Sequence, residues 1–215
     1  MRKLILLGTV AVLASCGGNA ERKAPTEKVT PIKSAAHCVY AFNQENTSFN
    51  WLAYKHTDRI GVPGVIDSAS VTGMVTAENP QEVFKNASVT LFMPSLDSKD
   101  ATRDKKIVDI FFGAMTNAES ITGKVMSVSG DNEAGTGEIM LGFNEKSNTL
   151  PFEYAITDSR LKLTFVVNFN DFGAENAVEV LNKACDERHT GKDGKSVLWP
   201  DVKVTIVSTL DKECD

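Results

Sequence analysis

Apolar and polar residues alternate along much of the chain after residue 36, and this pattern predicts β-strands. The clearest run covers residues 160–169, where nearly every second side chain is large and apolar. Residues 48–55, 88–93 and 202–208 repeat the same period of two. This period places successive side chains on opposite faces of a sheet, so each run has one face for the core and one for water. Turn-forming residues stand between the runs, at residues 61–64, 130–132 and 193–194 and at Gly135 with Gly137.

Helical patterns are few. Residues 79–86 begin with Asn79 as a cap and Pro80 in the first turn, and residues 171–187 place apolar side chains at helical spacing. Residues 103–116 are a weaker third candidate. Many short strands with few helices indicate an all-β antiparallel sandwich or barrel. A barrel of about eight strands encloses either packed side chains or one elongated ligand, and the pattern alone leaves both open.

The first residues have the layout of an export signal. Arg2 and Lys3 precede a short apolar run, which ends in Leu-Ala-Ser directly before Cys16. The run is shorter than the roughly 20 residues that cross a bilayer. The segment resembles a bacterial lipobox, whose cysteine carries lipid and becomes the new N-terminus. We therefore expect a signal peptide over residues 1–15 and lipidation of Cys16.

The domain boundaries follow from composition. Residues 16–35 contain almost no large apolar side chains, so we expect a lipidated flexible tether, followed by one domain over residues 36–215. Gly17, in place of aspartate, resembles the sorting signal for the outer membrane. The expected location is the bacterial cell envelope, lipid-anchored at the outer membrane and facing the periplasm, with exposure on the cell surface as the open alternative.

Charge narrows the choice of partners. The chain carries 23 basic and 28 acidic side chains, a net charge of −5, and loss of Arg2 and Lys3 makes it more negative. Nucleic acid requires a basic face, so we expect no nucleic-acid partner. The same balance argues against a second, electrostatic contact with anionic lipid. Contact with the membrane is therefore expected through the N-terminal lipid.

The number of cysteines that remain available for disulfide bonds is odd, and this limits how they can pair. With Cys16 assigned to lipid, Cys38, Cys185 and Cys214 remain, and they form at most one disulfide within the chain. A closed barrel places its first and last strands side by side, which favours Cys38–Cys214. Cys185–Cys214 is the alternative. The spacings do not match a zinc or redox motif, so we expect no metal site.

A series of short motifs follows one another along the chain: residues 48–55 followed by Gly61 and Gly64, residues 95–98, Arg103-Asp104, residues 110–112, residues 136–141 and residues 170–173. In content and order this series resembles the YceI-like family, which binds polyisoprenoids. The resemblance implies a lipocalin-like, eight-stranded antiparallel β-barrel with short helical inserts and an apolar interior that holds an isoprenoid chain.

The chain departs from the family pattern at several positions. Lys55 stands where the family often has histidine, and Lys105-Lys106 stand where it tends to have His-Leu. Ile110 replaces an aspartate, and residues 174–200 form an insert. These changes leave the expected fold intact and bear on the identity of the ligand.

The resemblance also implies a binding role for the apolar strand faces. A lipid cavity requires large apolar side chains and no buried charge. The residues expected to contact the ligand are Phe49, Trp51, Leu91, Met93, Leu163 and Phe165. We expect a non-catalytic carrier or storage protein for an isoprenoid or other amphiphilic lipid, with no cofactor apart from that lipid. The alternative is a filled barrel that acts as an envelope interaction or stress-related structural module.

Overall fold

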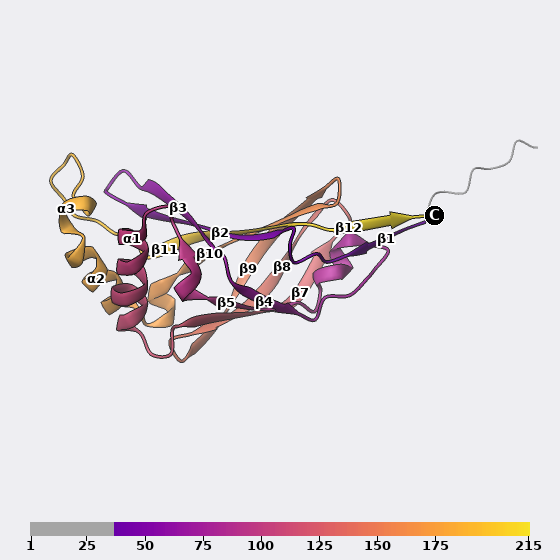
Figure 1. Cartoon of the computed structure of the whole chain (residues 1–215), viewed down its shortest axis with the longest axis horizontal. Helices are drawn as coiled ribbons and strands as arrows, with labels where there is room; N and C mark the ends of the chain where they lie inside the picture. The colour runs from indigo at the N-terminus through magenta and orange to yellow at the C-terminus, as the bar shows by residue number, and fades with distance from the viewer. Residues whose placement is uncertain (1–36) are drawn as a thin grey trace, which may run out of the picture. The chain divides into compact units, whose positions relative to one another are not determined.

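The computed structural model describes residues 37–215, and the predicted signal peptide, Cys16 and tether lie outside them. The chain folds into a curled antiparallel sheet that forms a half-barrel, with most of its short helices gathered at one end (Figure 1). The all-β, lipocalin-like architecture predicted from the sequence is confirmed. No helix within the described residues is long and apolar enough to cross a membrane.

The main sheet has ten strands, where the sequence predicted eight. The two edge strands are the shortest of the sheet, since β6 has two residues and β4 has four. In spatial order the strands are β4 (Ala69–Thr72), β5 (Ser88–Phe92), β7 (Ser120–Gly130), β8 (Ala134–Phe143), β9 (Lys146–Thr157), β10 (Arg160–Asn168), β11 (Asp201–Thr209), β2 (Thr47–Lys55), β3 (Ile60–Ile66) and β6 (Leu96–Asp97).

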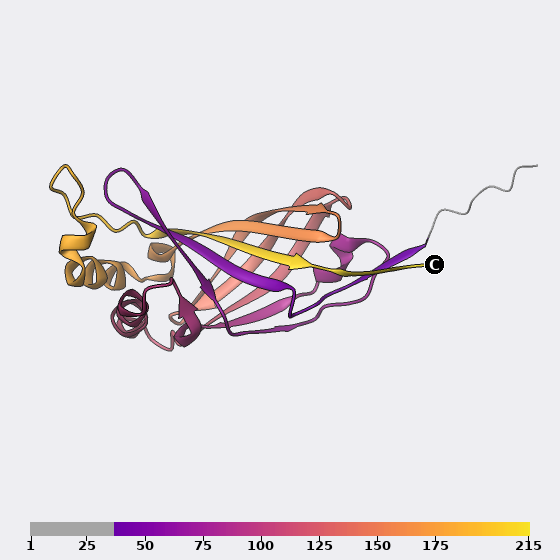
Figure 2. The same ribbon diagram turned by 45° about the horizontal axis from the view of Figure 1, so that its top comes forward.

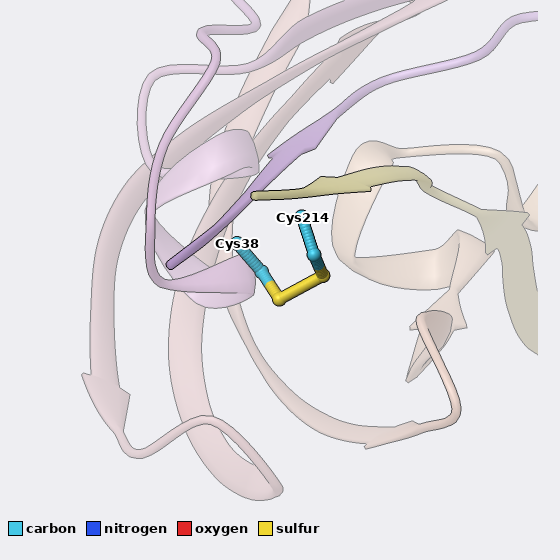
Figure 3. The surroundings of a disulfide bond; sticks show 2 residues. All are labelled: Cys38 and Cys214. Atoms are coloured by element: carbon cyan, nitrogen blue, oxygen red, sulfur yellow. A yellow bond between two sulfur atoms is a disulfide. The ribbon is translucent and has the colours of Figure 1, made fainter. Parts of the chain in front are cut away.

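The first and last strands pair with each other outside the main sheet. β1 (Cys38–Ala41) and β12 (Asp211–Cys214) form a separate two-stranded sheet in which Cys38 lies opposite Cys214. A disulfide joins the two residues (Figure 3). This is the pairing that the sequence favoured. The geometric reason differs, because the two strands form a ribbon of their own and do not close a barrel.

The helices cover the end of the half-barrel opposite to this ribbon (Figures 1 and 2). They come from two parts of the chain: α1 (Ala101–Lys106), η3 (Ile107–Phe111) and η4 (Phe112–Ala114) from the first, and η5 (Phe169–Phe172), α2 (Glu175–Ala184) and α3 (Asp186–His189) from the second. Two further short turns, η1 (Pro80–Phe84) and η2 (Met93–Ser95), lie beside β5 in sequence.

Strand alternation places the core on the concave side of the sheet. In β10, Leu161, Leu163, Phe165 and Val167 are buried, while the residues between them are exposed or half-buried. At the helical end, aromatic rings continue this core. The ring centroids of Phe143 and Phe172 lie 4.1 Å apart, and those of Phe111 and Phe169 lie 4.8 Å apart. Burial of these large side chains is the main stabilising contribution to the domain.

Two of the predicted turns are strands. Residues 61–64 belong to β3, and Gly135 and Gly137 belong to β8. Pro63 is tolerated because the other neighbour of β3, β6, pairs only with Val65 and Ile66 and needs no N–H group from Pro63. The predicted turns near residues 130–132 and 193–194 do lie in connections between elements.

Candidate functional site

A cavity of about 210 Å³ lies where the sheet meets the helices. Its wall combines strand residues such as Phe49, Phe165 and Val204 with Ile107 of η3 and Val178 of α2. A single water needs only about 10–15 Å³ of such space, so the cavity is far larger than a packing defect. The cavity is large enough to admit a small organic molecule.

Two tryptophans form part of the wall, and the chain has no others. The indole N–H of Trp51 in β2 donates to the carbonyl of Val65 at 3.2 Å. The indole N–H of Trp199, just before β11, donates to the carbonyl of His56 at 2.8 Å. Because backbone carbonyls satisfy both N–H groups, the rings add apolar surface to the site without an unpaired donor.

The charged residues that line the cavity are Lys55, Arg103, Lys106 and Arg188. They are half-buried or exposed, whereas strand residues such as Phe165 and Phe169 are buried, so these four residues mark the rim where the cavity meets solvent. The ammonium of Lys55 donates to the carbonyl of Arg188 at 3.0 Å, and that of Lys106 donates to the carbonyl of Ala184 at 3.2 Å. These bonds connect β2 and α1 to the segment that contains α2 and α3.

His189 at the C-terminal end of α3 also lines the cavity and is buried. Its Nδ1 lies 2.9 Å from Oδ1 of Asn182. Burial lowers the pKa of His189 to about 4, and the positive charges of Lys55 and Lys106 add to the effect. The imidazole is therefore neutral near pH 7, with Nδ1–H donating to the amide oxygen.

The family assignment follows from a match that spans most of the domain. Residues 40–210 match the model of the YceI-like domain. The chain belongs to the YceI-like family. No curated protein is significantly similar to the chain in sequence.

Solved structures show the same fold at low sequence identity. A polyisoprenoid-binding domain from Saccharophagus degradans superposes with a TM-score of 0.55 at 12% identity, covering 83% of this chain and 100% of that one. BcnA from Burkholderia cenocepacia gives 0.53 at 12%, covering 79% and 99%. The YCEI protein of Campylobacter jejuni gives 0.50 at 18%, covering 74% and 89%. At these identities the likeness shows the fold alone.

The cavity of this YceI-like domain brings together five of the six residues predicted to contact a ligand, namely Phe49, Trp51, Leu91, Met93 and Phe165. Leu163 does not line it. Leu163 lies two residues before Phe165 on the same inward face and lines a second cavity of about 50 Å³, which also touches Phe49. Alternation identifies the inward face of a strand but not the position of a cavity along it, and for this reason the sequence grouped Leu163 with the other five residues.

The Arg-Asp motif of the family has a local structural role here. The guanidinium of Arg103 donates through Nε to Oγ of Ser98 at 2.7 Å and through Nη2 to the Ser98 carbonyl at 2.5 Å. Asp104 accepts hydrogen bonds from the backbone N–H and the hydroxyl of the same serine. Asp100 caps α1 by accepting from the N–H groups of Thr102 and Arg103. The motif thus fixes the segment that leads into α1.

Sequence reasoning missed the helical part of the wall. The insert over residues 174–200 was identified as an addition to the family pattern, and it supplies Val178, Leu181, Leu198 and Trp199 to the cavity. It also supplies Cys185, the free cysteine among residues 37–215. The helical spacing of Val178 and Leu181 was the available signal, but spacing shows an apolar face and not what the face covers.

Proposed function

We propose that this YceI-like domain binds the hydrocarbon chain of an isoprenoid or another amphiphilic lipid and carries or stores it without chemical change. The observation that carries the proposal is the cavity, whose wall is apolar and whose charged side chains lie at the rim. The polyisoprenoid-binding domain from Saccharophagus degradans, which shares the fold, supports the same class of ligand. The presence of this cavity argues against the alternative, in which side chains fill the barrel and the protein acts as an interaction or structural module.

The energetics suit a flexible chain. Each methylene that leaves water contributes about 0.8 kcal/mol, so burial of roughly ten carbons gives about 8 kcal/mol before the costs of association. Met93 and Phe49 offer contact surface of different shapes, and the Met93 thioether adapts to a ligand without fixed shape. Affinity in this scheme depends on chain length more than on a unique set of hydrogen bonds.

Lipid content tests the proposal. We would express the full chain with Cys16→Ser, which prevents lipidation, and extract the purified protein with organic solvent for mass spectrometry. We expect a chain lipid at close to one molecule per protein. Absence of any lipid in the extract, together with no change in tryptophan fluorescence on addition of geranylgeraniol, would contradict the proposal.

The anchor is a second part of the proposed function. Lipid on Cys16 would hold the domain at the bacterial outer membrane, and residues 17–35 would give it reach toward the bilayer from which it takes its ligand. The support is the order of charge, apolar run and cysteine in residues 1–16. We expect the wild-type chain in the membrane fraction with the mass of an acylated N-terminus, and Cys16→Ser in the soluble fraction. A soluble wild-type chain would contradict the anchor and leave lipid binding untouched.

A further inference from the structure

A second cavity continues the main cavity along the concave side of the sheet. The main cavity is the one of about 210 Å³ described above, and the second measures about 50 Å³. In β10, Phe165 lines the main cavity, and Leu163, two residues before it, lines the second. Positions two residues apart divide in the same way in β11, with Val204 and Ile206, and in β5, with Leu91 and Val89. The two cavities therefore follow one another along the strands.

Phe49 lies between the two cavities. It is the one residue among residues 37–215 that lines both of them, and it is only 6% exposed. In register, Phe49 lies opposite Ile66 of β3 and Ile206 of β11. Ile66 lines the main cavity and Ile206 lines the second. The phenyl ring of Phe49 is therefore the partition between the cavities.

The second cavity is suited to hydrocarbon. Among the described residues that line it, only Thr47 and Ser208 have polar side chains, and none is charged. Their hydroxyl oxygens lie 2.7 Å apart, and the hydroxyl of Thr47 donates to the carbonyl of Asn43 at 2.7 Å. Ser208 therefore donates to Thr47, and both hydroxyl hydrogens are used within the protein. A small cavity with so few polar partners holds water poorly and favours an apolar group.

The sizes of the two cavities set a scale for the length of a chain. A methylene group is close to a water molecule in size, and a water needs about 10–15 Å³ of this space. The main cavity of about 210 Å³ then takes roughly 14–21 such groups, and the second cavity of about 50 Å³ adds roughly 3–5. The second cavity is therefore large enough for about one further isoprene unit.

We propose that Phe49 sets the length of the hydrocarbon chain that this domain holds. A chain that enters the main cavity ends at the phenyl ring, which separates it from the second cavity. Each further methylene that leaves water adds to the affinity, so the gain with chain length should stop where the ring blocks the chain. This role rests on the proposed lipid-binding function and makes Phe49 a determinant of specificity for chain length.

A series of alcohols of increasing length tests this role. Geraniol, farnesol, geranylgeraniol and geranylfarnesol have two to five isoprene units. Each would be titrated into the full chain carrying Cys16→Ser, with Trp51 and Trp199 as fluorescent reporters in the cavity wall. We expect affinity to rise at least about tenfold from geraniol to farnesol, and geranylfarnesol to bind within about threefold of geranylgeraniol.

Two outcomes of the series separate this role from the proposed function. A gain of about tenfold or more from geranylgeraniol to geranylfarnesol would overturn the role of Phe49, because the chain would already pass the ring, and would leave lipid binding in place. Failure of all four alcohols to bind would overturn the proposed function itself.

Phe49→Ala joins the two cavities, and Phe84→Ala is the matched control. Phe84 is 2% exposed and lines only the second cavity, so its loss enlarges that cavity by the same ring and keeps the partition. We expect Phe49→Ala to bind geranylfarnesol at least about tenfold more tightly than geranylgeraniol, and Phe84→Ala to bind the two alcohols as wild type does.

Phe49→Leu leaves a smaller apolar side chain at the partition and should show an intermediate gain. It replaces Phe49→Ala in the experiment if the alanine variant does not fold. The wild-type dependence on chain length in the Phe49 variants, or an equal gain in Phe84→Ala, would overturn the partition.

Discussion

The indole of Trp51 lies against the backbone of Gly64, its partner in register on the neighbouring strand. Trp51 in β2 and Gly64 in β3 face each other across the antiparallel pair. A Cβ atom at Gly64 would lie only 2.1 Å from Cζ2 of Trp51. The absence of a side chain at Gly64 therefore lets the indole cover β3 and take its place in the cavity wall.

Gly64→Ala should disturb the cavity through Trp51. The added methyl forces the indole out of its present position, and we expect a loss of about 1–3 kcal/mol in the free energy of unfolding, a shift of the tryptophan emission and weaker binding of geranylgeraniol. Gly61→Ala on the same strand is the matched control, because its Cβ would meet only the end of the Leu52 side chain, at 3.0 Å. Indistinguishable emission spectra and affinities for the two variants would show that the Trp51–Gly64 contact does not shape the site.

The same kind of contact, between an aromatic ring and a glycine on the neighbouring strand, explains why glycines of β8 were predicted to form turns. In β8, Gly135 lies opposite Tyr154 and Gly137 lies opposite Phe152. A Cβ at Gly137 would lie 2.3 Å from Cζ of Phe152. These glycines make room for aromatic rings of the adjacent strand, and they do not form turns. A sequence shows the glycine but not the ring on the neighbouring strand that requires it. Judged from the sequence alone, a glycine between two strands indicates a turn.

Other features were predictable because they depend on short-range patterns. The period of two identified β10 and β11 almost to their ends and placed Phe165 on the inward face, since alternation is a property of one strand alone. The basic rim was not predictable in this way. Lys55 and Lys106 are far apart in sequence, and only the packing of α1 and the residue 174–200 insert beside the end of β2 brings them to one cavity.

Filling the cavity should abolish ligand binding and leave the fold intact. Val204 in β11 lies opposite Trp51 and Phe165 in register and lines the cavity. We expect Val204→Phe to lower the affinity for geranylgeraniol by about tenfold or more, because the phenyl ring takes space that the chain would fill. Titration followed by tryptophan fluorescence measures the loss.

Val166→Phe is the control for this substitution. Val166 lies on the adjacent β10, is 52% exposed and does not line the cavity. The same increase in side-chain size at this position should leave the affinity of the protein for geranylgeraniol unchanged. A Val204→Phe protein that binds as tightly as the Val166→Phe protein would place the ligand elsewhere.

The Cys38–Cys214 disulfide should contribute to stability and not to binding. It links residues 176 positions apart, so it restricts the unfolded chain strongly, and bonds of this kind typically contribute about 2–5 kcal/mol. We expect Cys38→Ser with Cys214→Ser to lower the urea midpoint accordingly. Binding of geranylgeraniol should stay within about twofold of wild type, because none of the cavity residues comes from β1 or β12.

Cys185→Ser supplies the comparison for the disulfide variant, since Cys185 is free and lies in the cavity wall. Its effect on the urea midpoint should be smaller than that of losing the bond. If the doubly substituted protein unfolded at the wild-type urea concentration, the ribbon of β1 and β12 would not restrict the chain in solution.

His189 should make the domain less stable in mild acid. Its pKa is about 4 in the folded protein and 6.5 in an unperturbed state, so well above pH 6.5 the residue is neutral in both states and adds no pH dependence. As the pH falls from 6.5 toward 4, the unfolded chain takes up a proton that the folded chain refuses, and stability is lost. The loss reaches at most about 3 kcal/mol.

Urea unfolding of wild type and His189→Gln at pH 7, 5.5 and 4 measures this effect. Glutamine can still donate to Asn182 but does not titrate, so its stability should fall less over this interval, and the carboxylates that both proteins share cancel in the difference. His37→Gln is the control, because His37 is 56% exposed and contacts Glu78 at the surface. Parallel stability curves for wild type and His189→Gln would mean that this imidazole takes up its proton as readily in the folded state as in the unfolded one.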